Sequence, residues 1–380
     1  MIIKIDGIGA TNKGAQLMLF SVVDRMKKYD PSAEFILSSY SFNKLNQVVK
    51  DYDRVFLSRS LAARVKMKMM KMLGLKQRDL MLKALPKKID VALDAGGYQF
   101  GDSWNHSEED IAWIRRYYSA LKERGAKIIM LPQAFGPFEK ETSRKMISTA
   151  AGFADLIFPR DPESLAHLQQ IFGTVKHFDI YGDFTNLLSY AKNDTPKGDD
   201  KICFILNQKM IAGAADISEQ EYISFFVRMI SHVRSKSENE IVLLNHEGAG
   251  DLALCNKVNA HFDGALHVIT GQNALQIKEF LSGCLFVVSS RYHGIISALS
   301  QQVPCLATSW SHKYEELYRE FELPHFVLDL ARPENANHLI EGLLDVKENE
   351  RIREALKGKN NIFANRTEEM WQKVFTVIEK

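Results

Sequence analysis

Residues 286–299 read FVVSSRYHGIISAL, an apolar run, a polar turn and a second apolar run. The first run predicts a buried strand and the second a buried helix. Arg291 and His293 therefore stand at the start of a helix, whose dipole favours anions. Lys313 follows the next predicted strand, residues 304–307. Together the three side chains predict an anion pocket with a proton source, although each alone is also common at a strand end.

The same alternation of strand-like runs and segments of helical period extends over the whole chain. The predicted strands are residues 2–6, 34–39, 54–57, 89–94, 127–131, 156–158, 202–206, 240–245, 266–270, 285–289 and 304–307. The predicted helices are residues 14–28, 43–50, 108–123, 139–152, 162–171, 218–236, 250–261, 274–283, 294–302 and 348–379. Strands separated by amphipathic helices indicate βαβ units, and hence parallel sheets with helices on both faces.

The length of 380 residues exceeds what a single core usually supports, so two domains are expected. Residues 191–201 are polar, contain Pro and Gly, and lack an apolar period, which is typical of a linker. We expect Rossmann-like domains over residues 1–190 and 202–347, and a helical segment over residues 348–380 that packs back across them. The fold class is α/β, two doubly wound domains facing a central cleft between the carboxyl ends of their sheets.

The composition argues against several classes of function. Apolar residues make up 46% and charged residues 25% of the chain, as in an ordinary globular protein, and the net charge of +2 gives no field for nucleic acid. No signal peptide and no run long enough to span a membrane are apparent. We expect a cytoplasmic protein with its four cysteines reduced and in the core; these are Cys203, Cys255, Cys284 and Cys305.

One segment, residues 59–88, is strongly basic. It contains ten Lys or Arg residues, a single acidic residue, Asp79, and five methionines. A basic, Met-rich helical stretch is a candidate for contact with an anionic membrane surface. A solvated basic face with methionine as core filler explains the same pattern, and both interpretations remain open.

The stretch GIGATNKGAQ, residues 7–16, follows a predicted strand and opens a helix. Its glycines let the backbone approach a ligand, and the helix N-terminus attracts an anion. The spacing fits neither the dinucleotide-binding nor the P-loop pattern. A tight turn in which Asn12 caps the helix needs no ligand at all.

The stretch LDAGGYQFGD, residues 93–102, places Asp94 and Asp102 after a strand. A carboxylate there could take a proton from a sugar hydroxyl. Alternatively, both carboxylates orient the loop backbone.

Two further stretches in the first half of the chain, residues 131–138 and 159–164, follow predicted strands and carry candidate binding residues. LPQAFGPF, residues 131–138, predicts a stiff loop in which Gln133 reads hydroxyls, or an ordinary turn. PRDPES, residues 159–164, sets Arg160 at a strand end, where it binds a phosphate or carboxylate or pairs with Asp161.

In the second half, His246, Glu247 and Asp251 come after a predicted strand. Histidine beside carboxylates invites a metal interpretation, but the spacing fits no metal-ligand pattern. We therefore predict neither a metal nor a cofactor.

Taken in order, these motifs resemble one family. NKGA, DAGG, LPQAFGP, RDPES, the region from His246 to Asp251, SRYHG and WSHKYEE occur in the order found in polysaccharide pyruvyl transferases, over residues 2–325. Two positions depart from the family pattern: Ala95 stands where a third glycine is frequent, and Tyr292 where leucine is common.

The resemblance implies a GT-B-like fold and transfer of pyruvate from phosphoenolpyruvate, as co-substrate, onto a sugar diol. A ketal forms and phosphate is released. His293 would be the general acid and Arg291 would hold the donor, with Lys313 and Arg160 neutralising further charge. Because neighbouring cations lower the pKa of a histidine, proton donation would depend on the bound anionic donor. The general base is not identified.

The implied site has a donor side in the second domain and an acceptor side in the first. The catalytic residues are His293, Arg291 and Lys313. The donor-binding residues are Arg160, Arg291, Ser290, Gly294 and Lys313. The residues that contact the acceptor or line the cleft are Asn12, Gly14, Asp94, Gly96, Gly97, Asp102, Gln133 and His246.

The acceptor would be a polysaccharide precursor, such as one for capsule or exopolysaccharide, or a lipid-linked oligosaccharide. In the latter case residues 59–88 would bring the protein to the inner face of the cytoplasmic membrane. Two other functions fit the architecture: a glycosyltransferase that uses a nucleotide sugar, and a non-catalytic protein that binds anions or sugars. The sequence does not reveal the oligomeric state.

Overall fold

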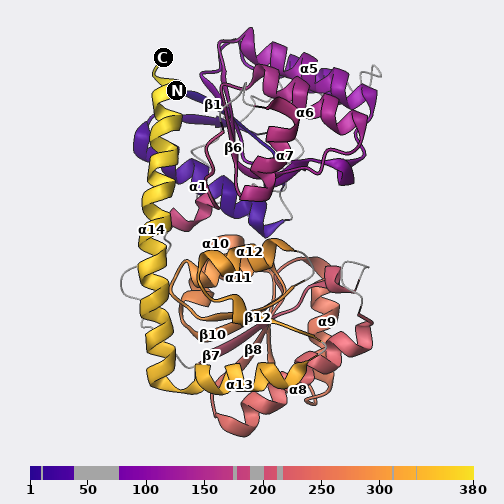
Figure 1. Cartoon of the computed structure of the whole chain (residues 1–380), viewed down its shortest axis with the longest axis vertical. Coiled ribbons are helices and arrows are strands. Elements are labelled where there is room, and N and C mark those ends of the chain that lie inside the picture. Colours follow the sequence, from indigo (N-terminus) through magenta and orange to yellow (C-terminus); the bar gives the residue numbers. More distant parts are fainter. Residues whose placement is uncertain are drawn as a thin grey trace. The chain divides into compact units, whose positions relative to one another are not determined.

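The computed structural model describes residues 1–9, 12–37, 77–173, 178–188, 201–211, 217–309, 312–330 and 332–380 (Figure 1). The predicted helix over 43–50, the predicted strand over 54–57 and most of the basic segment 59–88 lie outside these residues. The chain divides into two compact units. Unit 1 comprises Met1–Leu188 and Asn365–Lys380, and unit 2 comprises Ser189–Ala364.

Unit 1 is a parallel α/β unit. Its described strands are β1 (Ile2–Asp6), β2 (Glu34–Ile36), β3 (Val91–Asp94), β4 (Tyr98–Phe100), β5 (Lys127–Phe135) and β6 (Leu156–Pro159). Its described helices are α1 (Lys13–Tyr29), α4 (Gln77–Lys83), α5 (Glu108–Lys122), α6 (Glu141–Phe153) and α7 (Pro162–Phe172), with 3₁₀ turns at Asp102–Trp104 and Phe184–Leu187. The strand order is β2-β1-β3-β5-β4, and β6 also pairs with β5.

The helices of unit 1 cover both faces of its sheet. Figure 1 shows α5 and α6 side by side on one face and α1 on the other. The α5 and α6 face is packed by Tyr118 and Leu121 of α5 and Ile147 of α6 against Met130 of β5. Polar side chains cap the N-termini of α1, α5 and α7, and in α5 Ser107 and Asp110 form a reciprocal capping box.

The predicted loop over residues 131–138 is wrong in its first half. β5 runs on through Gln133 to Phe135, because β4 pairs with Ala134 and Phe135, and Pro159 of β6 lies opposite Gln133. Because β4 and β6 both pair with it, the Pro-containing stretch after Leu131 forms the last part of the central strand β5.

Unit 2 is a second parallel α/β unit. Its described strands are β7 (Lys201–Ile205), β8 (Glu240–Leu244), β9 (His267–Ile269), β10 (Cys284–Ser289), β11 (Cys305–Thr308) and β12 (Val327–Leu328). Its described helices are α8 (Glu219–Lys236), α9 (Gly248–Ala260), α10 (Ala274–Ser282), α11 (Tyr292–Leu299), α12 (His312–Glu320) and α13 (Pro333–Leu344), with 3₁₀ turns at Gln208–Met210 and Pro324–Phe326. The strand order is β12-β11-β10-β7-β8-β9.

In each sheet, the direction in which successive strands are added reverses at a particular place, which we call the reversal point. In unit 2 the chain winds from β7 to β8 and β9, then returns to place β10 on the other side of β7. Among the described strands of unit 1, the same reversal occurs between β1 and β3. Open α/β sheets bind ligands at the carboxyl ends of the strands that flank such a reversal.

The predicted linker between the two domains, residues 191–201, ends one residue earlier in the structure. Lys201, taken as the last linker residue, is the first residue of β7, where it pairs with Glu240 of β8 in the sheet. The rest of the predicted linker lies outside the described residues.

The C-terminal helix α14 (Val346–Ile378) belongs to both units. From Asn365 onward it packs within unit 1, where the Trp371 ring meets Phe184 edge-on at 6.3 Å and Phe375 stacks on Tyr29 at 4.1 Å. Arg25 of α1 pairs with Glu368 on the same helix. The end of the chain therefore completes the core of unit 1.

The four cysteines are free and buried, as predicted. Among the helices of the described ranges, none is both long enough and apolar enough to cross a membrane.

Replacing Trp371 with alanine is expected to lower the free energy of unfolding of unit 1 by about 3–5 kcal/mol, because a fully buried ring leaves a cavity. Amide hydrogen exchange of α1, followed by mass spectrometry, reports this loss within unit 1. Ile362→Ala, on the same helix but 54% exposed, should change stability by less than about 0.5 kcal/mol. Unchanged protection of α1 in Trp371→Ala would contradict the assignment of α14 to the unit 1 core.

Candidate functional site

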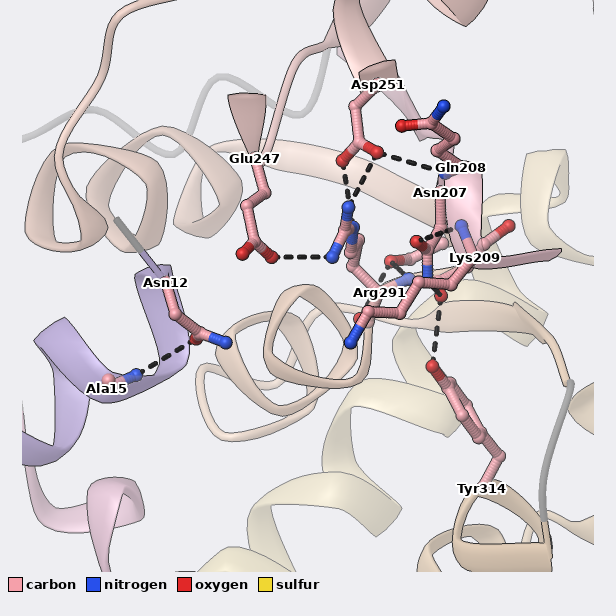
Figure 2. Close-up of polar contacts among 11 residues, drawn as sticks. Asn12, Ala15, Asn207, Gln208, Lys209, Glu247, Asp251, Arg291 and Tyr314 are labelled. Atoms are coloured by element: carbon pink, nitrogen blue, oxygen red, sulfur yellow. Dashed lines mark hydrogen bonds and ion pairs between the residues drawn. The ribbon is translucent and has the colours of Figure 1, made fainter. Parts of the chain in front are cut away.

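Arg291 occupies the reversal point of unit 2. It follows β10 and is the N-cap of α11. Its Nε and Nη2 donate to the two carboxylate oxygens of Asp251, at 2.8 and 2.6 Å, and its Nη1 donates to Glu247 at 2.6 Å. Figure 2 shows the guanidinium between these two carboxylates, which come from the start of α9.

The two carboxylates differ in accessibility. Asp251 is fully buried and also accepts the backbone N–H of Gln208 at 3.0 Å. Glu247 is the N-cap of α9 but its side chain makes no capping bond, and it is 27% exposed. Asp251 therefore holds the guanidinium from inside the protein, whereas Glu247 is the more accessible of its two partners.

The two carboxylates make the surroundings of Arg291 less cationic than the predicted anion pocket. An arginine has five N–H donors, and the carboxylates take three, which leaves one on each terminal nitrogen. One positive charge set against two negative charges gives the trio a formal charge of −1. Any anion that binds to the Nη1 of Arg291 must therefore compete with Glu247.

Ser290 is a structural residue, which corrects its prediction as a donor contact. Its side chain is fully buried, and its hydroxyl bonds to Tyr222 at 2.6 Å and Thr308 at 2.5 Å. Its carbonyl accepts from Asn207 Nδ2 at 2.9 Å and Tyr314 Oη at 3.0 Å. With every polar group bonded inside the protein, Ser290 holds the turn beneath Arg291.

Gly294 was also predicted to contact the donor, but it is buried in the first turn of α11. A Cβ there would lie 2.8 Å from Ser289 Oγ and 3.1 Å from Ile205 Cδ1. Glycine is needed at this position so that α11 can pack closely on the ends of β10 and β7.

The other predicted site residues of unit 2, His293, Lys313 and His246, differ in their burial and in how much of them the structure describes. His293 is the second residue of α11, half-buried, with its ring edge-on to Tyr292 at 5.5 Å. Lys313 belongs to α12, but its side chain lies outside the described part of the structure, so its approach to Arg291 stays a prediction. His246 is only 3% exposed, so its predicted contact with the acceptor does not fit its burial.

The reversal point of unit 1 carries a pair of carboxyl groups. Asp6 and Asp94 end β1 and β3 and are opposite each other in the sheet register. Asp94 is buried and accepts the Gly96 N–H at 3.0 Å and the Gln99 side-chain amide. With both oxygens engaged and only 4% of its surface exposed, Asp94 orients the loop backbone and is poorly placed to take a proton from a sugar hydroxyl.

The neighbours of Asp6 decide which carboxyl carries the charge. Lys4 Nζ lies 2.5 Å from Asp6, and the Tyr117 hydroxyl donates to it at 2.7 Å. Burial raises the pKa of Asp94 to about 7, hydrogen bonding by Gly96 opposes this, and the charge of Asp6 adds to it. Asp6 is therefore the paired anion, and Asp94 retains a proton over much of the acidic range.

Other predicted residues of unit 1 take backbone-orienting positions. Asn12 is exposed and caps α1 through the N–H of Ala15 at 3.1 Å (Figure 2). The Asp102 carboxylate accepts the backbone N–H groups of Glu139 at 2.8 Å and Lys140 at 3.1 Å.

Gly14 lies at the start of α1, and Gly96 and Gly97 lie in the loop after β3. Gly14 is buried in the first turn of α1, and a Cβ on Gly97 would lie 3.0 Å from Met18 Cε of that helix. The loop after β3 therefore packs directly on α1.

Gln133 and Arg160 meet at the ends of β5 and β6. Arg160 donates its backbone N–H to the Gln133 carbonyl at 3.1 Å, and its guanidinium reaches the Gly97 carbonyl at 3.3 Å and Asp161 at 3.5 Å. Gln133 is completely buried, and neither amide atom has a hydrogen-bond partner in the described chain. A buried unpaired amide costs about 1–3 kcal/mol, so this strand end suits a polar guest such as water or a hydroxyl.

Two residues that support the turn before Arg291, Asn207 after β7 and Tyr314 of α12, were not predicted to do so. Asn207 follows β7 as Ser290 follows β10, and this shared position after an apolar strand was the available signal. Tyr314 belongs to the WSHKYEE motif, but its role was not predicted, because the Ser290 carbonyl to which it donates lies 24 residues away in the chain.

Comparisons with solved structures agree with this architecture. The chain is similar to UDP-GlcNAc 2-epimerase from Neisseria meningitidis bound to UDP-GlcNAc, with a TM-score of 0.61 and 9% identity over 99% of each chain. It is also similar to HepE from Anabaena in complex with UDP-glucose, with a TM-score of 0.60 and 10% identity over 100% of this chain and 99% of that one. A glycosyltransferase from Rickettsia africae ESF-5 gives a TM-score of 0.57 and 12% identity over 100% and 98%.

The two doubly wound units thus have the GT-B fold. The family model for polysaccharide pyruvyl transferase matches residues 12–312, and the chain belongs to that family. No curated protein matches the chain.

The raised pKa of Asp94 predicts a pH-dependent stability. Unfolded Asp94 loses its proton near its ordinary pKa of 3.8, whereas in the folded protein it does so near 7. Unfolding between these values releases a proton, so stability falls as pH rises. Relative to Asp94→Asn, the wild type should lose about 3 kcal/mol between pH 4.5 and 7.5. Urea unfolding at each pH measures this, and equal slopes for the two proteins would refute it.

Proposed function

We propose that the protein transfers pyruvate from phosphoenolpyruvate onto a sugar diol of a polysaccharide precursor, forming a ketal and releasing phosphate. The observation that carries the proposal is the position of the family motif SRYHG. It puts Arg291 at the N-cap and His293 in the first turn of α11, at the reversal point of unit 2, where open α/β sheets bind ligands.

In this proposal Arg291 anchors the donor. Asp251 holds the guanidinium through two hydrogen bonds, so its remaining N–H groups have a fixed direction. A phosphate or carboxylate is bound well by such a fork, because its oxygens match the spacing of the N–H groups. The donor displaces Glu247, the more accessible partner.

His293 then acts as the general acid. It protonates the methylene carbon of phosphoenolpyruvate, which becomes a methyl group and leaves C2 as an oxocarbenium-like centre. The first sugar hydroxyl attacks C2 and returns a proton to His293. The second hydroxyl displaces phosphate, which departs with the other hydroxyl proton. Two C–O bonds form, one C–O bond breaks, and the two hydroxyl protons end on the methyl group and on phosphate.

Removing the competing charge at Arg291 should strengthen donor binding. Glu247→Gln is expected to tighten the binding of phosphoenolpyruvate about tenfold, because the carboxylate no longer occupies Nη1 and one negative charge is lost. Isothermal titration calorimetry measures the affinity. Glu354→Gln makes the same change at an exposed ion pair with Lys357 on α14 and should leave the affinity unaltered. Weaker binding by Glu247→Gln would show that Glu247 supports the donor instead.

The reaction itself is tested by incubating the protein with phosphoenolpyruvate and galactose-, mannose- and N-acetylhexosamine-linked acceptors. Release of phosphate together with a mass gain on the acceptor is the expected result. His293→Ala should lower the rate by about 10²–10⁴-fold with donor binding kept, since a general acid acts only in the chemical step. His261→Ala, at the exposed end of α9, is the matched control. Turnover of a nucleotide sugar in place of phosphoenolpyruvate would overturn the proposal.

A further inference from the structure

Trp104 is an exposed tryptophan on the carboxyl-end side of the unit 1 sheet. It closes the 3₁₀ turn Asp102–Trp104, which comes directly after β4. β4 runs parallel to the last part of β5, so this turn lies at the same edge as the ends of β3, β5 and β6. The indole is 52% exposed although burying it would be favourable.

The turn that carries Trp104 is held firmly. The Tyr98 hydroxyl donates to the Gly136 carbonyl at 3.0 Å and accepts from Ser103 at 2.9 Å. Gly101 permits this contact, because a Cβ there would lie 2.5 Å from the Tyr98 oxygen. Asp102 is tied by two backbone N–H groups that precede α6. These hydrogen bonds fix the turn, so the position of Trp104 is preorganised.

The surroundings of Trp104 suit a carbohydrate ring. The half-buried Tyr98 ring lies 6.4 Å from the indole, tilted by 53°, so a second aromatic ring adjoins the exposed tryptophan. Ser103 and Asn105 on either side are exposed and polar. A sugar presents C–H groups on one face and hydroxyls at its edge, which match an aromatic surface bordered by hydrogen-bonding side chains.

A protein partner fits these observations less well. The other large apolar residues that are exposed in the described chain, Val346 and Ile362, belong to unit 2. An isolated aromatic pair with polar neighbours lacks the contiguous apolar patch that protein interfaces use.

We infer that Trp104 and Tyr98 form a platform on which a sugar ring of the acceptor stacks. The inference rests on the proposed function for the identity of the acceptor, and it assigns acceptor recognition to a part of unit 1 outside the family motifs.

The test measures binding of galactose-, mannose- and N-acetylhexosamine-containing oligosaccharides by calorimetry without phosphoenolpyruvate. At least one class should bind, with affinity lowered about fivefold to tenfold in Trp104→Ala and largely restored in Trp104→Phe, which keeps an aromatic face. Ile362→Ala, an exposed apolar residue of unit 2, should bind as the wild type does. In turnover assays Trp104→Ala should raise the KM for the acceptor and leave that for phosphoenolpyruvate unchanged.

The outcomes separate the platform from the reaction. If sugar binding depends on Trp104 but phosphoenolpyruvate is not turned over, the platform stands and the proposed reaction fails. If turnover proceeds and Trp104→Ala has the wild-type KM for the acceptor, the platform fails and the reaction stands. Failure of every sugar class to bind the wild-type protein also counts against the platform.

Discussion

The ion pair between Arg291 and the buried carboxylate of Asp251 is the contact on which the candidate site most depends. β10 and β8 lie on either side of β7, so the pair joins the segments that follow them across the end of the central strand. Asn207, which follows β7, bonds to the carbonyl just before Arg291 and completes the connection. Removing one member of such a pair leaves an uncompensated buried charge, which typically costs about 3–5 kcal/mol. The same contact therefore organises unit 2 and aims the proposed donor anchor.

At each reversal point two carboxyl groups lie near a cationic side chain, and the excess negative charge is handled differently in the two units. In unit 2 two carboxylates surround a single guanidinium, and the more accessible one, Glu247, can leave. In unit 1 the ammonium of Lys4 pairs with Asp6, and a second negative charge beside it is avoided because burial raises the pKa of Asp94 to about 7. Neither edge is a simple cationic pocket, and in the proposed reaction the donor binds Arg291 by displacing Glu247.

Much of the fold follows from the sequence, since parallel strands buried on both faces appear as continuous apolar runs. The helix start at Arg291 was predicted from the same contrast between apolar and polar runs. The partners of Arg291 were not, because Asp251 and Glu247 are 40 and 44 residues away and only the sheet order brings them together. Ser290 and Asp94 were placed correctly at strand ends, whereas Gln133 was predicted in a loop and lies within β5. For all three, residue type does not show that the side chain turns inward. Trp104 escaped notice because a lone tryptophan in a loop has no periodic signal.

The most direct test of the central claim, that Asp251 aims Arg291 at the donor, is the affinity for phosphoenolpyruvate of four proteins. These are the wild type, Asp251→Asn, Arg291→Ala and the double variant, titrated by calorimetry after circular dichroism confirms that each is folded. Simple electrostatics favours tighter anion binding once Asp251 is neutral. The account predicts the reverse: Asp251→Asn binds about tenfold more weakly, and the double variant no more weakly than Arg291→Ala. Binding by Asp251→Asn as tight as that of the wild type, or tighter, would contradict it.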